Sequence, residues 1–223
     1  MIGIFDSGRG GVAIARELLA LCPRCDVLLL ADRKNLPYGT KSDRELTPIV
    51  EENLKRLRSY GADRLLIGCC TASSIYERFF EPSPCVTPII EPTARRAAEV
   101  TVGKICVIAT ESTVRSHAFG SAISRYSKAT VTEFAAGELV GIAERICAGA
   151  PSEKDIKKIK KALEPARATG ADTLVLGCTH FPLISEYISA FLPDVSIVSC
   201  VREGALAALS YAKAGEGRII YTE

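Results

Sequence analysis

The sequence lacks a strong excess of charge of either sign, and it has no long apolar run. Its 223 residues carry 28 basic and 26 acidic side chains, for a net charge of +2. This balance excludes binding to nucleic acid or to an anionic membrane by bulk electrostatic attraction. No apolar stretch approaches the roughly 18 residues that a membrane span needs. We therefore expect a soluble globular protein with neither of these partners.

The N-terminus also lacks the positively charged segment of a secretory signal, since Met1 to Asp6 read directly as a strand. Nine cysteines are scattered along the chain, an odd number for a disulfide framework. Both features favour reduced thiols in the cytoplasm. Cys22 and Cys25 have the spacing of a redox pair, but they lie between a helix and a strand, whereas a thioredoxin-type pair opens a helix. We expect them to be incidental loop cysteines.

Short apolar runs alternate with helical patterns through the chain. The runs are continuous rather than alternating with polar residues, as expected for strands whose two faces are both covered. With 48% apolar residues, the chain can bury a core as one large or two small domains. The predicted strands are Ile2–Phe5, Val27–Leu30, Leu65–Ile67, Ile89–Ile90, Ile105–Ile108, Thr130–Phe134, Leu174–Leu176, Val195–Val198 and Ile219–Tyr221.

Helical periodicity fills the segments between these strands. The clearest case opens with Ser42 and Glu45, which have the spacing of a capping box. Strand–helix alternation of this kind predicts an α/β fold with mainly parallel sheets. The predicted helices are Val12–Leu21, Ser42–Arg58, Glu138–Cys147, Glu153–Arg167 and Leu183–Leu192.

One segment of the sequence occurs twice. Gly61–Cys69 returns as Gly170–Cys178, and each copy is an apolar run that ends in Gly-Cys. The repeat predicts two related halves, each with a cysteine where a buried strand meets a helix. A Pro after Glu91 marks the first break, and the chain returns near Ser199. We therefore expect a first domain of residues 1–92 plus 200–223 and a second of residues 93–199.

Ligands collect at the carboxyl ends of strands in open α/β sheets, and four strand ends here carry unusual residues. The Gly-rich turn at Asp6–Gly11 presents backbone N–H groups to an anion, and a substrate carboxylate fits it better than a phosphate. Asp32 after the second strand keeps a dinucleotide site open as an alternative, and a purely structural tight turn is another. The remaining two strand ends carry the repeated cysteines.

Cys69 and Cys178 are the residues with the most reactive chemistry. Both are expected to open helices, and a helix N-terminus lowers the pKa of a thiol from its usual value near 8.5. His180 follows Cys178 closely and could relay a proton. The thiols could instead be small core side chains, a disulfide, or part of a metal site that also uses Cys70. The spacing alone leaves these alternatives and proton transfer open.

At this point the sequence resembles the cofactor-independent aspartate/glutamate racemase family. The motifs run in the family's order from the first residues to the end, and His180 after Cys178-Thr179 points to the glutamate branch. They are Phe5-Asp6-Ser7-Gly8 with Gly10-Gly11, Asp32 with Pro37-Tyr38-Gly39, Cys69 with Thr71-Ala72, Glu111-Ser112-Thr113, Gly177-Cys178-Thr179-His180-Phe181-Pro182-Leu183 and Ile219-Ile220-Tyr221-Thr222.

The resemblance implies two pseudo-symmetric α/β domains with the active site in the cleft between them. One Cys thiolate would remove the α-proton of an amino acid while the other thiol protonates the opposite face, with neither pyridoxal phosphate nor a metal. The resemblance assigns catalytic roles to Cys69, Cys178, Asp6, His180, Asp32 and Glu144, and substrate contacts to Ser7, Pro37, Tyr38, Gly39, Cys70, Thr71 and Thr179. Asp6 would assist Cys69 and His180 would assist Cys178.

The chain departs from the family at several positions. Cys70 stands where the family has Asn, Arg9 where it has a small apolar residue, and Ser199-Cys200 where it has Asp-Ser. The chain also stops sooner after Thr222 than most relatives. The resemblance implies racemisation of L- and D-glutamate, supplying D-glutamate for peptidoglycan. Cys70 favours another small carboxylate as an alternative substrate, and a non-catalytic relative that binds an amino acid or a protein is a second alternative. The oligomeric state is open, with a homodimer as one option.

Overall fold

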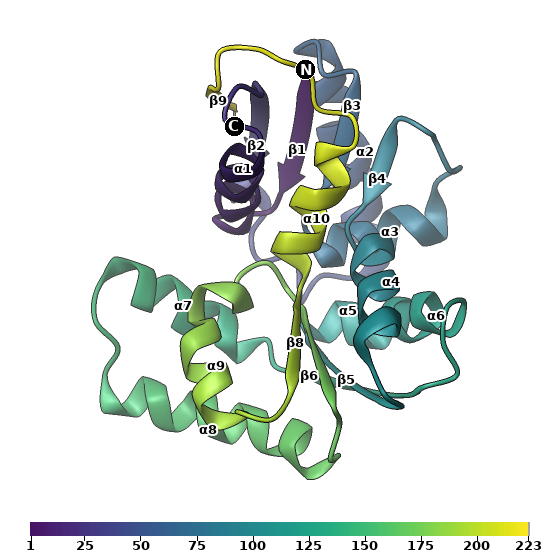
Figure 1. Ribbon diagram of the computed structural model, residues 1–223. Helices are drawn as coiled ribbons and strands as arrows, with labels where there is room; N and C mark the ends of the chain where they lie inside the picture. Colours follow the sequence, from purple (N-terminus) through teal and green to yellow (C-terminus); the bar gives the residue numbers. More distant parts are fainter. Residues whose placement is uncertain (223) are drawn as a thin grey trace.

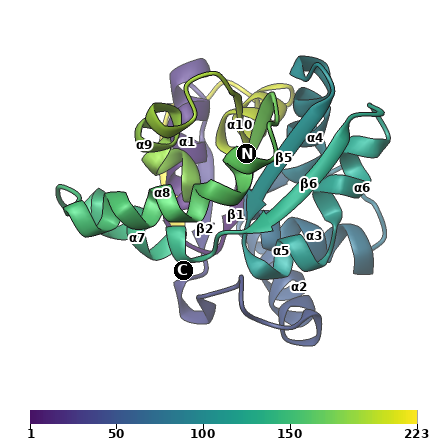
Figure 2. The ribbon, with the colours of Figure 1, turned by 90° about the horizontal axis from the view of Figure 1, so that it is seen from below.

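A computed structural model describes residues 1–222 of the chain (Figure 1). The described residues form two parallel β-sheets with helices on their faces, which confirms the predicted α/β class with two pseudo-symmetric units. Figures 1 and 2 show the second sheet with α7 (Glu138–Ala148) and α8 (Glu153–Ala168) on one side, and α5 (Glu111–Arg115) and α6 (Ala118–Ser124) on the other.

The first sheet has five parallel strands in the order β4-β3-β1-β2-β9. The neighbouring strands β1 and β2 are buried along their whole length, because helices cover both faces of the sheet. The strands are β1 (Ile2–Asp6), β2 (Val27–Ala31), β3 (Arg64–Ile67), β4 (Val86–Pro88) and β9 (Ile219–Thr222).

The second sheet repeats this arrangement with four parallel strands in the order β6-β5-β7-β8. In each sheet the first strand of the unit lies between the second and the third, so β1, β2 and β3 correspond to β5, β6 and β7. The sequence repeat is therefore a structural repeat, and β3 and β7 occupy equivalent places. The strands are β5 (Lys104–Ala109), β6 (Thr130–Ala135), β7 (Thr173–Gly177) and β8 (Ser196–Ser199).

The helices begin close to where the sequence predicts. In α2 (Asp43–Ser59) the predicted capping box is present: Ser42 Oγ accepts a hydrogen bond from the Glu45 backbone N–H, and the Glu45 carboxylate accepts one from the Ser42 backbone N–H. The remaining helices are α1 (Gly10–Leu21), α3 (Cys70–Phe79), α4 (Ile90–Val100), α9 (Ser185–Phe191) and α10 (Cys200–Leu209), with short 3₁₀ turns at η1 (Arg33–Asn35) and η2 (Phe181–Ile184).

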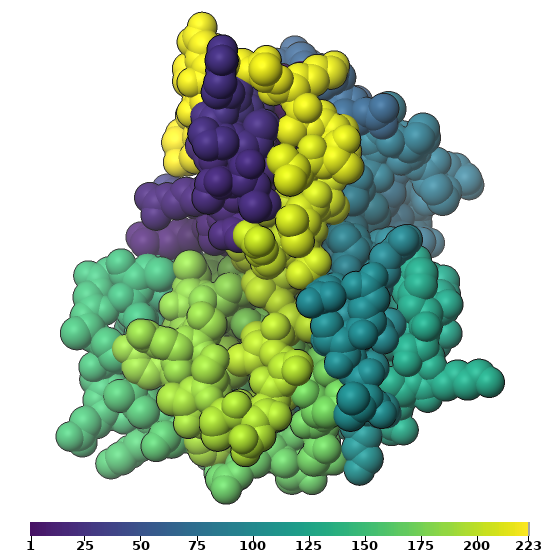
Figure 3. Space-filling model, in the orientation of Figure 1, coloured from purple at the N-terminus to yellow at the C-terminus, as the bar shows by residue number. Residues whose placement is uncertain are grey.

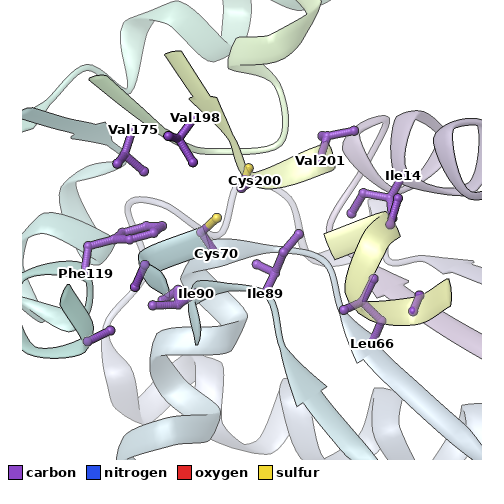
Figure 4. Packing of buried hydrophobic residues seen from close by; sticks show 14 of the residues in the cluster. Ile14, Leu66, Cys70, Ile89, Ile90, Phe119, Val175, Val198, Cys200 and Val201 are labelled. Carbon is purple, nitrogen blue, oxygen red and sulfur yellow. The ribbon is translucent and has the colours of Figure 1, made fainter. Parts of the chain in front are cut away.

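The two units share a hydrophobic core. Helix α10 packs against both α1 and α4, and the space-filling view shows the N-terminal and C-terminal segments in contact on one face (Figure 3). The cluster around them takes side chains from both sheets, including Ile14, Leu66, Val175 and Val198 (Figure 4). This shared core holds the carboxyl ends of the two sheets against each other. We retain residues 1–92 plus 200–223 and 93–199 as proposed domains.

Three predictions need correction. The strand predicted at Ile89–Ile90 is wrong. The fourth strand, β4, ends at Pro88, while Ile89 is the N-cap of α4 and Ile90 its first residue. The helix predicted from Leu183 begins at Ser185, after a 3₁₀ turn. Cys22 and Cys25 are joined by a disulfide rather than reduced, because the turn between them brings their Cα atoms to 5.6 Å.

No helix within residues 1–222 combines the length and the apolar character that a membrane crossing requires.

Candidate active site

The carboxyl ends of both sheets meet at one cavity of about 90 Å³. A cavity needs about 10–15 Å³ for each water molecule, so this one has room for a small amino acid. Asp32, which kept a dinucleotide site open as an alternative, does not line this cavity. The lining residues are Ser7, Leu36, Pro37, Tyr38, Gly39, Thr40, Cys69, Cys70, Thr71, Thr110, Glu111, Gly137, Val140, Gly177, Cys178, Thr179 and His180.

The first unit contributes Cys69 from the end of β3. Gly68 follows the strand, and Cys69 is the N-cap of α3, as predicted. Ser7 follows β1, and its hydroxyl donates a hydrogen bond to Cys69 Sγ at 3.5 Å. Because β1 and β3 are neighbours in register, with Phe5 opposite Ile67, the residues that follow them are brought together.

The second unit contributes Cys178 from the equivalent end of β7. Its Sγ lies 3.9 Å from Nδ1 of His180, and Nε2 of the same ring lies 2.9 Å from Oε1 of Glu144 on α7. Cys178 and His180 are buried, while Glu144 is about one-third exposed. The structure thus brings the three residues together, with the histidine in contact with a thiol through Nδ1 and with a carboxylate through Nε2. This is the arrangement of a base oriented by an acid.

Both thiols are free, so they do not form a disulfide with each other. The part of the chain that the structure describes also has no group of three or more His, Cys, Asp or Glu side chains arranged to hold a metal ion. Of the alternatives that the sequence leaves open, buried thiols that line a cavity on opposite sheets agree best with proton transfer.

Direct contacts tie the two units together around the cavity. The Thr71 hydroxyl lies 2.9 Å from that of Thr110 and 3.1 Å from that of Thr113, which belong to the second unit. The backbone N–H of Ser112 donates to the Gly39 carbonyl at 3.0 Å. These contacts cross between the sheets, so the cavity is closed on this side.

Asp6 and Asp32 stand behind the cavity wall rather than in it. The Asp6 carboxylate accepts hydrogen bonds from the Gly8 backbone N–H at 2.8 Å and the Thr179 hydroxyl at 3.1 Å. Asp32 accepts one from the Tyr38 hydroxyl at 2.5 Å and another from Asn53 at 2.9 Å. Asp32 therefore fixes the ring of Tyr38, which lines the cavity with its neighbours Pro37 and Gly39.

The electrostatics of the thiols differ from the prediction. Burial raises the pKa of Cys69 to about 11, with a further contribution from nearby Asp6, and the hydrogen bonds from Ser7 and the backbone at the start of α3 only partly oppose this. Burial also raises the pKa of Cys178 well above its ordinary value. The expected lowering by a helix N-terminus is outweighed, and Cys178 is followed by a 3₁₀ turn rather than an α-helix.

Cys70 lies on the apolar side of the cavity. It is buried and belongs to the core cluster shared by both units, where it lies against Cys200 at the start of α10 (Figure 4). Burial and the Cys200 thiol hold the pKa of Cys70 well above its ordinary value, so this thiol stays neutral. Two positions that depart from the family pattern therefore contact each other.

The predicted site omitted several lining residues from the second unit, above all Thr110 and Glu111, although Glu111 begins one of the motifs shared with the family. Thr110 follows β5 as Ser7 follows β1, so the equivalence of the two halves was the signal that could have found it. Glu111 begins α5. Its carboxylate lies against Gly137 and occupies the space that a side chain at position 137 would need. Leu36 and Val140 carry no motif and were out of reach of the sequence.

Known proteins resemble this chain in both sequence and fold. A family model described as Asp/Glu/Hydantoin racemase matches residues 11–208 of the chain. The chain belongs to this family. Among its relatives, the glutamate racemase of Desulforudis audaxviator is 36% identical over 202 residues, which span 88% of this chain and 73% of that protein. The glutamate racemase of Corynebacterium diphtheriae is 38% identical over 215 residues, 92% of this chain and 78% of the relative.

Solved structures of the family share the fold. A glutamate racemase isoform from Bacillus anthracis superposes with a TM-score of 0.86 at 29% identity, covering 99% of this chain and 86% of that one. The Francisella tularensis glutamate racemase, solved in complex with D-glutamate, gives a TM-score of 0.83 at 25% identity, with 100% and 88% coverage. The chain thus has the two-unit architecture of these racemases over nearly its whole length.

Proposed function

We propose that the protein is an amino-acid racemase that interconverts L- and D-glutamate by proton transfer between Cys69 and Cys178. One observation carries the proposal: two free thiols at equivalent strand ends of the two sheets line the same small cavity. The names of the relatives, and the D-glutamate in the Francisella structure, favour glutamate as the substrate.

The reaction begins with one cysteine as a thiolate and the other as a thiol. The thiolate takes the α-proton, the electron pair of the C–H bond stays on the α-carbon, and the thiol delivers its proton to the opposite face. The enzyme is left with its two thiols in the reverse protonation states, and exchange with water restores them. Since inversion needs one base on each face, both cysteines are obligatory.

Forming a thiolate in a buried site adds to the barrier that the weakly acidic α-C–H bond already sets. With a pKa of about 11, the Cys69 thiolate costs about 5 kcal/mol at pH 7 in the empty cavity. The ammonium group of the substrate brings a positive charge close to the thiols, which favours the thiolate form once substrate is bound. A cavity that excludes water strengthens this attraction.

Each thiol has its own supporting group. Ser7 donates its hydroxyl to Cys69, which favours the thiolate over the thiol. His180 lies beside Cys178 and is oriented by Glu144, so it can hold or return a proton at that sulfur. Thr71, Thr179 and the backbone near Gly39 line the cavity, and the two hydroxyls, which here pair with Thr110 and Asp6, would turn toward the substrate carboxylates on binding.

A direct test is incubation of the protein with L-glutamate in D₂O, with ¹H NMR of the α-proton and chiral chromatography of the product. Loss of the α-proton signal together with formation of D-glutamate supports the proposal. Because Cys70 makes part of the wall apolar, the same assay is run with other small amino acids, and turnover of one of these alone would move the assignment to that substrate. No exchange with any of them would indicate a binding protein.

We also propose that the product serves peptidoglycan synthesis, the role that the family resemblance implies. The test is expression of the gene in a bacterial strain that cannot grow without added D-glutamate. Growth without D-glutamate supports this role. Failure to grow, despite racemase activity in an extract of the same cells, would contradict it.

A further inference from the structure

Arg9 connects the two units at the edge of the candidate site. It lies in the turn between β1 and α1, and its Nε is 2.8 Å from Oε2 of Glu144 on α7. Arg9 thus belongs to the first unit and its ionic partner to the second. Sequence alone assigns no function to Arg9, because nothing in its own neighbourhood predicts a partner 135 residues away.

The second oxygen of Glu144 is also engaged. Its Oε1 lies 2.9 Å from Nε2 of His180, whose Nδ1 lies 3.9 Å from Sγ of Cys178. Arg9, Glu144, His180 and Cys178 therefore form one continuous chain of contacts, which runs from the half-exposed guanidinium to the buried thiol.

The arrangement has a physical consequence for the histidine. A carboxylate held only by the ring could rotate about its side-chain bonds and take the ring with it. When Arg9 holds one oxygen, the other stays directed at Nε2, and the ring is kept edge-on to the sulfur. Partners one step removed from a reacting group commonly set its orientation and its proton position in this way.

We propose that Arg9 is a positioning residue for the Cys178 side of the reaction, acting through Glu144 and His180. This inference rests on the proposed racemase function and extends it to a residue outside the cavity. Because the Arg9–Glu144 pair forms only when the two units are in contact, it also couples the order of the histidine to closure of the site.

The first test compares Arg9→Val and Arg9→Lys with wild type in glutamate racemisation. Exposed ion pairs contribute about 0.2–1 kcal/mol, so we expect Arg9→Val to lower kcat about two- to fivefold. Arg9→Lys keeps a cation in reach and should recover most of the loss. The control is Arg145→Val. Arg145 is the neighbour of Glu144 on α7 and pairs with Asp155 on α8, without a link to His180, so this variant should leave kcat unchanged.

A double-mutant cycle shows whether Arg9 acts through Glu144. Glu144→Ala should lower kcat on its own, and adding Arg9→Val to it should cause no further loss, because Glu144→Ala removes both the contact to Arg9 and the contact to His180. A full additional loss in the double variant would overturn the proposal, as would wild-type kcat in Arg9→Val.

A second readout needs no turnover. The chain has only two histidines, His117 and His180, so the ¹⁵N signals of their rings can be assigned from a single His117→Asn variant. Arg9→Val should shift the His180 ring signals, and the His117 signals, whose ring contacts Glu133, should stay in place. Unchanged His180 signals would refute the role of Arg9 even if glutamate is racemised. Shifted signals in a protein without racemase activity would support the contact and refute the proposed function.

Discussion

The Thr179 hydroxyl donates a hydrogen bond to the Asp6 carboxylate at 3.1 Å, and this contact joins the end of β7 to the end of β1. The two residues are 173 positions apart and belong to different sheets. Asp6 is fully buried, and burial raises its pKa above the ordinary value even though His180 and the hydrogen bonds from Gly8 and Thr179 oppose the shift. Asp6 therefore links the two sheets, while the burial of its charged carboxylate lowers the stability of the fold at neutral pH.

Asp6→Asn should make the protein more stable at pH 7 and less active. The folded-state pKa of Asp6 is raised, so its contribution to stability is present below the unfolded value of 3.8 and is lost as the pH rises through the folded value. Each kcal/mol regained should raise Tm by about 2–4 °C, and thermal melts at pH 7 and pH 4.5 should show the gain shrinking at the lower pH. Racemase activity should fall at least about tenfold. A variant that melts lower than wild type at pH 7 would contradict this.

Gly10→Ala should block closure of the two units. A Cβ at Gly10 would lie 1.9 Å from Thr179 Oγ1 and 2.3 Å from Thr179 Cβ, so β1 and β7 must move apart to accommodate it. A displacement of about 1 Å at a reacting centre can cost about 100-fold, and we expect at least this loss of kcat/KM. The control is Gly141→Ala in α7, where only the end of Arg145 comes near, at 3.6 Å. Gly141→Ala should keep full activity. If Gly10→Ala is equally active, the close approach of Gly10 to Thr179 is not needed for racemisation.

Tyr38→Phe should destabilise the protein through Asp32. Burial alone would raise the pKa of Asp32, but hydrogen bonds from Tyr38, Asn35 and Asn53 outweigh it and lower the pKa. Removing a hydrogen bond to a charged group should cost about 1.5–3 kcal/mol in urea unfolding at pH 7. This stability is present above pH 3.8 and is lost as the pH falls through the folded value, so the two proteins should converge in acid.

The control for this loss is Tyr221→Phe, which removes a hydroxyl from an exposed ring. It should match wild type within about 0.5 kcal/mol, the usual range for surface substitutions. If Tyr38→Phe behaves like this control at pH 7, the proposed support of Tyr38 by Asp32 is wrong.

The rate of racemisation should rise with pH from pH 7 to pH 9. With the pKa of Cys69 at about 11 in the free protein, the thiolate fraction grows about tenfold for each pH unit below that value. Since kcat/KM reports the ionisation of the free enzyme, it should climb between pH 7 and pH 9 in a pH–rate profile. A profile that is flat over this range would mean that the thiolate forms at a lower pH than burial allows.

The same shift predicts the alkaline behaviour of the fold. A thiol pKa raised in the folded state contributes stability that is present below the unfolded value of 9.0 and is lost as the pH rises through about 11. Cys69→Ala should therefore lose less stability than wild type between pH 9 and pH 11 in chemical unfolding. An identical loss in the two proteins would contradict the raised pKa.

Much of this architecture could be predicted from the sequence because its signals are local. Short apolar runs located eight of the nine strands within residues 1–222, and the Gly-Cys repeat indicated two equivalent units. The strand predicted at Ile89–Ile90 was wrong. A short apolar run suits the first turn of a buried helix as well as a strand, and here the strand ends at Pro88 and the apolar pair starts the helix. The motifs also named most of the residues that line the cavity.

What the sequence could not supply were the contacts between the units. The link from Arg9 to Glu144, the Thr71–Thr110 contact and the proximity of Cys70 to Cys200 all depend on how the two sheets are packed. The pKa of the thiols was misjudged for the same reason, since the helix N-terminus is visible in the sequence while the burial that outweighs it is a property of the closed fold.

The central claim is that Cys69 and Cys178 each serve one face of the same substrate. The most direct measurement follows α-proton exchange in D₂O for L- and D-glutamate separately in wild type, Cys69→Ala and Cys178→Ala, with Cys106→Ala as the control for removal of a buried thiol outside the cavity. We predict that wild type and the control exchange and invert both enantiomers. Each single active-site variant should lose inversion by at least about 1,000-fold, and any remaining exchange should be confined to one enantiomer, opposite in the two variants. Retained inversion in either variant would contradict the claim.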